Sequence, residues 1–184
     1  DGKKGIKVVP CYYKKDYPEK SDKGDGNPLT VATHMPNSPI INTGKREGAK
    51  IRLPNGNYLE ETAYYYVLME TKAGGMTPAL ITMKSSQLSV SKNWNSMMKT
   101  IQIEDGKGGF VTPPMHAVVY NLSSAIQKND KGSWYGWSIT QDRIMGQSDK
   151  ALYLSAKRFA NDIPEGKAAQ AKADEEEKSD STPY

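Results

Sequence analysis

The chain of 184 residues has few of the side chains that usually carry catalysis or bind metals. It contains one cysteine, Cys11, and two histidines, His34 and His116. A single cysteine excludes an internal disulfide and fits a reducing compartment. These residues match no metal-binding spacing, and no glycine-rich phosphate loop follows a predicted strand. We therefore expect a protein that is not an enzyme and that needs no metal or cofactor.

Long apolar runs are also missing. No stretch holds 18 consecutive apolar residues, so the sequence predicts no membrane span. The first ten residues, DGKKGIKVVP, lack the apolar run of a secretory signal. Apolar residues make up only 36% of the chain, which predicts that much of it is loop or tail.

Charge is distributed unevenly along the chain. Residues 162–184 hold seven acids and three lysines and so carry −4, which leaves +8 on residues 1–161. A basic body with an acidic tail is typical of polyanion binding, with the tail as a competitor or a docking peptide. A soluble domain with a solvated tail is the alternative interpretation.

The apolar residues follow two different periods. Alternation and β-branched or aromatic content predict five strands, over residues 5–13, 57–71, 77–84, 115–122 and 133–140. Steps of three and four residues predict helices over 86–101 and 147–163. Pro10 indicates an edge or a bulge within the first strand.

A helix between the third and fourth of five strands is the layout of an OB-fold barrel, which binds oligonucleotides. We therefore predict a mainly β protein with two helices, an OB-fold-like five-stranded barrel with a long polar insertion at 14–57 after the first strand. An α+β sandwich would give the same order of elements and is the alternative. The predicted domain covers 1–163, and 164–184 form an acidic C-terminal tail.

Aromatic and basic residues lie next to one another at several points. Single-stranded nucleic acid requires cations along its phosphates and flat rings against its bases. The candidate nucleic-acid-binding residues are Tyr12, Tyr13, Lys14, Lys15, Lys45, Arg46, Lys50, Arg52, Lys128, Lys131, Tyr135 and Trp137.

Not every ring can bind bases, because the chain has only two phenylalanines and needs other rings in its core. Trp94 lies on the apolar side of the first predicted helix and is expected in the core. Tyr135 and Trp137 share one face of a predicted strand, whereas Trp134 points to the other. For Tyr135 and Trp137 the sequence leaves both a core position and a base platform open.

Four blocks of sequence carry a resemblance to a known family: NYLEETAYYYVLM, ALITMKSSQLSVSKNWNSMM, FVTPPM and QKNDKGSWYGW. In order and spacing they resemble a family of small proteins from tailed bacteriophages, over about residues 5–160. Some members are labelled single-stranded DNA-binding proteins. The resemblance implies the host bacterial cytoplasm and a role in phage DNA replication or recombination. The alternative is a phage protein-interaction module that binds a host protein or forms part of the virion, for which the methionines would suit adaptable contacts.

The segment DEEEKSDSTPY resembles the acidic ends of bacterial and phage single-stranded DNA-binding proteins, with Tyr184 where phenylalanine is usual. This resemblance implies that the tail binds replication or recombination proteins. The tail residues concerned are Asp174, Glu175, Glu176, Glu177, Pro183 and Tyr184.

Overall fold

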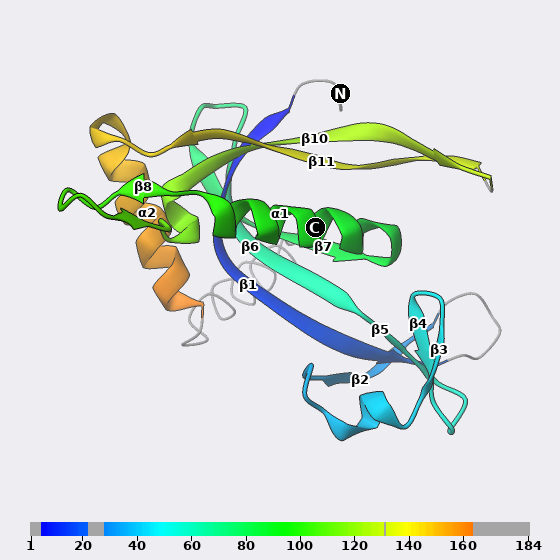
Figure 1. The fold of residues 1–184 in the computed structure, drawn as a ribbon. Helices are drawn as coiled ribbons and strands as arrows, with labels where there is room; N and C mark the ends of the chain where they lie inside the picture. Colours follow the sequence, from blue (N-terminus) through cyan, green and yellow to red (C-terminus); the bar gives the residue numbers. More distant parts are fainter. Residues whose placement is uncertain (1–4, 22–27, 131, 164–184) are drawn as a thin grey trace, which may run out of the picture.

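A computed structural model describes residues 5–21, 28–130 and 132–163, and Figure 1 shows its helices and strands. Five long antiparallel strands, in the order β7–β6–β1–β10–β11, form the main part of a nine-stranded sheet. Their bounds are Ile6–Lys20 for β1, Thr62–Glu70 for β6, Met76–Lys84 for β7, Val118–Asn129 for β10 and Gly132–Ile144 for β11. They correspond to the five predicted strands, although β1, β10 and β11 continue well past their predicted ends. The second predicted strand, 57–71, is divided into β5 (Tyr58–Glu60) and β6.

The remaining strands of this sheet form a small module around the second half of β1, at the lower right of Figure 1. We call it the distal module. Its elements are β2 (Thr30–His34), η1 (Pro39–Asn42), β3 (Lys45–Glu47), β4 (Lys50–Arg52) and β5 (Tyr58–Glu60). Tyr17, Ile51, Leu53 and Leu59 are buried together as its core. Residues 14–20 of the predicted insertion therefore continue β1, and much of the rest is folded.

Strand β1 serves both parts because it changes partners along its length. Ile6–Val8 pair with β10, Val8–Asp16 pair with β6, and the last residues pair with β2 and β5. The register shifts between Pro10 and Tyr12, as expected from the proline. Such a bulge bends a strand, and here it lies within the pairing with β6, shortly after the pairing with β10 ends at Val8.

The two predicted helices are present and cover opposite faces of the sheet. Helix α1 (Leu88–Thr100) follows the short helix η2 (Ser85–Gln87), and its Trp94 is only 1% exposed. The Trp94 ring stacks on Tyr65 at 4.4 Å and meets Tyr120 edge-on at 5.6 Å between centroids. The expected core position of Trp94 is confirmed.

Helix α2 (Lys150–Asp162) packs on the other face, where Ala156 is buried with Val9, Cys11 and Leu68. Burial raises the pKa of the Cys11 thiol to about 12, so the thiol stays protonated at neutral pH. None of the described helices is both long and apolar enough to cross a membrane.

The sheet curls around α1 as a half-barrel. Within the described residues β7 pairs only with β6, and β11 only with β10. Gln87, just before α1, accepts a hydrogen bond at 3.0 Å from the backbone N–H of Trp137 in β11. A side chain on Gly136 would begin 2.7 Å from the Gln87 Nε2 atom, so this glycine permits the close approach.

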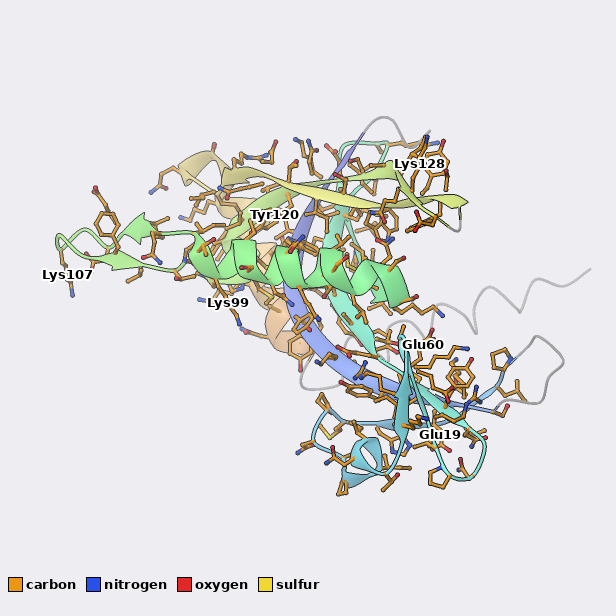
Figure 2. The ribbon with its side chains drawn as sticks, turned by 45° about the vertical axis from the view of Figure 1, so that its right-hand side comes forward. Glu19, Glu60, Lys99, Lys107, Tyr120 and Lys128 are labelled. Carbon is orange, nitrogen blue, oxygen red and sulfur yellow. The ribbon has the colours of Figure 1, made fainter. Side chains whose placement is uncertain are left out.

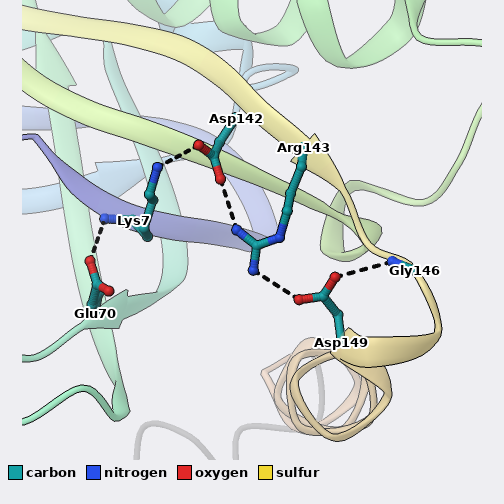
Figure 3. A network of polar contacts seen from close by, with 6 residues as sticks. All are labelled: Lys7, Glu70, Asp142, Arg143, Gly146 and Asp149. Carbon is teal, nitrogen blue, oxygen red and sulfur yellow. Dashed lines mark hydrogen bonds and ion pairs between the residues drawn. The ribbon is translucent and has the colours of Figure 1, made fainter.

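A chain of charged contacts joins β1, β11 and the start of α2 (Figure 3). Lys7 pairs with Asp142, and Arg143 contacts Asp142 and Asp149 at 2.8 Å each. The second oxygen of Asp149 accepts the Gly146 N–H at 3.1 Å, next to η4 (Gln147–Asp149). The ion pair with Lys7 lowers the pKa of Asp142, and that with Arg143 lowers the pKa of Asp149.

The remaining elements follow α1 and precede β10 along the chain. Strands β8 (Ile103–Glu104) and β9 (Phe110–Val111) form a separate two-stranded hairpin, and η3 (Met115–Ala117) leads into β10. In Figure 1 this hairpin projects to the left of the main sheet.

Candidate nucleic-acid interface

Strands β10 and β11 extend together past α1 (Figure 1) as a two-stranded projection, which we call the hairpin arm, residues 124–137. Tyr135 is 73% exposed and lies opposite Ile126, which is 59% exposed. Trp137 is 38% exposed and lies opposite Ser124. The sequence left open whether Tyr135 and Trp137 lie in the core or on the surface. The structure shows both side chains accessible to solvent.

The third ring of the arm has a different environment. Trp134 is half-buried, and its indole N–H donates to Gln127 Oε1 at 3.1 Å. The exposed Lys128 lies toward the end of the arm in Figure 2, whereas Lys131 falls outside the described residues. The arm therefore places two accessible rings near a cation, a combination suited to stacking bases and holding phosphates.

The face of the main sheet opposite α1 carries a second group of rings. Tyr12, Tyr64 and Tyr66 are half-buried there, and the rings of Tyr12 and Tyr66 lie 6.0 Å apart at 59°. Lys14 Nζ lies 5.2 Å from the centroid of Tyr64, and the exposed Leu80 of β7 pairs with Tyr66. We call Tyr12, Lys14, Tyr64, Tyr66 and Leu80 the tyrosine face.

Sequence reasoning left Tyr64 and Tyr66 out of the candidate site. Alternation along the strand puts them on the face opposite to Tyr65, but it does not show which face the helix α1 covers. The pairing of Tyr12 with Tyr66 across β1 and β6 brings the two segments together.

Tyr13 has the opposite orientation, and its predicted role needs correction. Its ring lies 4.9 Å from that of the buried Tyr65, and it packs against the main core. Because neighbouring residues of a strand point to opposite faces, Tyr12 and Tyr13 cannot both belong to the tyrosine face. The structure assigns Tyr13 to packing.

Besides Arg52, which is described below, three of the predicted phosphate-binding cations already contact carboxylates. Lys14 pairs with Asp16 at 2.7 Å, and this hydrogen bond raises the pKa of Lys14. Glu61 contacts Lys15 at 3.2 Å and Arg46 at 4.0 Å. A phosphate would have to compete with these carboxylates, which weakens the contribution of Lys14, Lys15 and Arg46 to an anion site.

The other three predicted cations of this region gather on one side of the β3–β4 hairpin. Lys45 pairs with Arg52 across the strands, and Arg52 pairs with Tyr58 of β5. Lys50 Nζ lies 3.9 Å from the centroid of the Tyr58 ring, and the guanidinium carbon of Arg52 lies 5.6 Å from it. We call Lys45, Lys50 and Arg52 the basic hairpin; Arg52 also contacts Glu47 at 3.5 Å.

A buried carboxylate holds the loop beside the basic hairpin. Glu19 is 6% exposed and accepts hydrogen bonds from Asn57 at 2.6 Å and Asn55 at 3.1 Å. His34 Nε2 lies 2.8 Å from its other oxygen. The hydrogen bond from Asn57 and then that with His34 lower the pKa of Glu19. His34 is therefore a structural partner of Glu19, which Figure 2 labels in the distal module.

Among the described residues, no three His, Cys, Asp or Glu side chains lie close enough together to bind a metal ion. The ring of His116 packs 5.4 Å from that of Tyr153 in α2. The predicted tail residues Asp174–Glu177, Pro183 and Tyr184 lie outside the described residues.

Comparison with curated proteins and with solved structures finds no match to this chain. The model of one family, described as Pam3 phage gp34-like protein, matches residues 2–169. The match contains the distal module, the tyrosine face and the hairpin arm, and it stops before the acidic run at 174–177. The chain thus belongs to the Pam3 phage gp34-like protein family, in agreement with its resemblance to small tailed-phage proteins.

Proposed function

We propose that this protein binds single-stranded DNA without sequence preference and supports phage DNA replication or recombination. The observation that carries the proposal is the hairpin arm, where Tyr135 and Trp137 are exposed near Lys128. Every base has a flat face, so exposed rings bind single strands of any sequence.

The order of the strands supports the same proposal. The first of the five long strands pairs with the second and the fourth, the second with the third, and the fourth with the fifth. We interpret this as an OB-type barrel left open, with α1 between its two end strands. In OB folds the ligand contacts strands two and three and the loops joining strands one to two and four to five. The corresponding parts are the tyrosine face, the distal module and the tip of the hairpin arm.

In this mechanism the basic hairpin and Lys128 hold phosphates while the rings stack on bases. Each phosphate contact releases counterions, so affinity should fall steeply with salt. The acidic residues 174–177 would compete with DNA for the cations and recruit replication or recombination proteins. This role rests on residues of this chain that lie beyond the family match.

The test is a titration with oligo-dT at two salt concentrations, followed by tryptophan fluorescence. Trp137 is exposed and Trp94 is buried, so quenching should come mainly from the arm and should be reduced in Trp137→Phe. Binding at low salt that weakens at high salt is expected. Absence of quenching at low salt, confirmed by a mobility shift, would exclude the proposal.

A second candidate function is a phage protein-interaction module, and exposed apolar side chains favour it. Leu29, Val31 and Met35 are exposed in and around β2, and Phe110 is exposed on β9. Capture of a partner from a host lysate treated with nuclease would support this function. Loss of every captured protein on nuclease treatment would favour DNA binding instead.

A further inference from the structure

A cavity of about 470 Å³ lies between α2 and the outer side of β6 and β7. Leu68, Met76 and Pro78 line it from the sheet, and Leu152 and Phe159 line it from the helix. Its polar lining comes from Ser155, Arg158 and Asp162 of α2. This cavity is a hollow that is widely open to solvent, and its volume is within the range of small-ligand sites.

The cavity adjoins the tyrosine face. Leu68 pairs with Pro78 across β6 and β7, and the next pair on the same face is Tyr66 with Leu80. Residues two apart along a strand are separated by roughly 7 Å, so the two pairs are direct neighbours. An extended ligand that stacks on Tyr66 therefore reaches the mouth of the cavity.

The lining suits a group that is flat and apolar on its faces but polar at its edges. The floor and the Phe159 ring are apolar, whereas Ser155 and Arg158 supply hydrogen-bond donors. The Arg158 side chain is 87% exposed, and its contact with Asp162 is long, at 4.0 Å. The Arg158 guanidinium is therefore free to bind a phosphate, which would compete with Asp162 for it.

We propose that this cavity takes one base of a single strand that lies across the tyrosine face, while Arg158 contacts an adjacent phosphate. The inference rests on the proposed function and adds a base-binding subsite to it. The adjoining tyrosine rings and the exposed cation Arg158 favour a nucleic acid over an apolar peptide, which would need neither.

The first test fills the cavity from the exposed side of α2. Ser155→Phe places a ring in the cavity, and Leu154→Phe adds the same ring at an exposed neighbouring position outside its lining. With oligo-dT, Ser155→Phe should weaken binding by about tenfold, the effect of losing one stacked base, and Leu154→Phe should bind like the wild type. If Ser155→Phe and Leu154→Phe bind oligo-dT equally well, the proposal is overturned. The same result is expected if the cavity binds a peptide and not a base.

The second test separates Arg158 from the general charge of α2. Arg158→Gln should reduce the slope of log affinity against log salt by about 0.7, as expected for one phosphate contact to a single strand. Lys157→Gln removes the neighbouring exposed charge, which does not line the cavity, and should leave the slope unchanged. Equal slopes in the two variants would contradict the phosphate contact.

The controls distinguish the two levels of the proposal. If wild-type protein fails to bind oligo-dT at low salt, the proposed function fails with the inference. If wild type binds and Ser155→Phe binds equally well, only the subsite is wrong. Thermal unfolding of each variant shows whether the fold is retained, and Arg158→Gln provides an independent test should the larger ring disturb α2.

Discussion

The two helices cover the two faces of one sheet in different ways. Helix α1 buries Ser91, Trp94 and Met98, and its tryptophan stacks within an aromatic core. Helix α2 buries only Ala156, and Asp149, which directly precedes it, is tied to Arg143 of β11. The α1 face is therefore closed by packing, whereas the α2 face keeps a cavity and half-buried rings beside it. We therefore expect the α1 face to provide most of the stability, and we propose that the α2 face contributes to DNA binding together with the hairpin arm.

The largest effect is expected from removing the ring that closes the α1 face. Trp94→Ala should lower the free energy of unfolding by about 3–5 kcal/mol, because it leaves a large cavity among Tyr65 and Tyr120. Urea unfolding measures the loss. On the other face, Tyr66→Ala should cost much less stability and weaken oligo-dT binding. A similar loss of stability in both variants would contradict the division between the faces.

A smaller effect is expected where α1 meets the hairpin arm. Gly136→Ala places a methyl group against Gln127 and Gln87 and should destabilise the protein by about 1–3 kcal/mol. Thermal unfolding measures the change. Gln87→Ala in the same chain removes one of the obstructing side chains, so part of the loss should be recovered. If the destabilisation by the two substitutions together equals the sum of their separate effects, Gln87 does not limit the approach of β11 to α1.

The arm should affect binding without affecting stability. Tyr135→Ala is expected to weaken oligo-dT binding by about tenfold, because one exposed stacking ring is lost. Its unfolding free energy should stay within about 0.5 kcal/mol of wild type, as for other surface substitutions. Thr140→Ala, on an exposed position of the same strand, is the matched control and should change neither quantity.

The smallest expected effect is a local one, in acid. The pKa values of Asp142 and Asp149 are lowered by Lys7 and Arg143 respectively, so their stabilisation is present above about pH 4 and is lost as the pH falls further. Helix α2 should loosen before α1, which has no such carboxylate in its packing.

Hydrogen exchange read separately for α2 and α1 between pH 6 and pH 3 tests this order, after correction for the intrinsic pH dependence of exchange. Arg143→Gln removes the ion pair. The amides of α2 should then exchange faster than in wild type at pH 6, and their exchange rate should rise less between pH 6 and pH 3. Equal loosening of both helices in wild-type protein would show that the ion pairs do not hold α2 specifically.

The sequence predicted the parts of this molecule that depend on local pattern. The five long strands, both helices, the bulge at Pro10 and the buried Trp94 all follow from spacing and from residue type. The sequence also predicted that Tyr135 and Trp137 share a face, but it left open whether that face is buried or accessible. In each case the determining residues lie close together in the chain.

What sequence reasoning missed depends on contacts between distant segments. Lys15 meets Glu61 across 46 positions of the chain, and the Tyr12–Tyr66 contact spans a similar distance. Strands β2, β3 and β4 of the distal module are only three to five residues long and lie among turn residues, so their alternation is too short to recognise. Strand β5 lies within the predicted strand 57–71. The module is held together because β2 and β5 pair with β1, β4 pairs with β3 and β5, and a small core packs around Leu59.

Strand β1 has one further consequence for the length of the binding surface. Its 15 residues extend over roughly 50 Å, and the same strand contributes Tyr12 to the tyrosine face and borders the distal module at its far end. The length of β1 therefore fixes the distance between the α2 cavity and the basic hairpin. The number of nucleotides that one protein covers would be set by this single strand, and lengthening or shortening it between Tyr13 and Tyr17 would change that number.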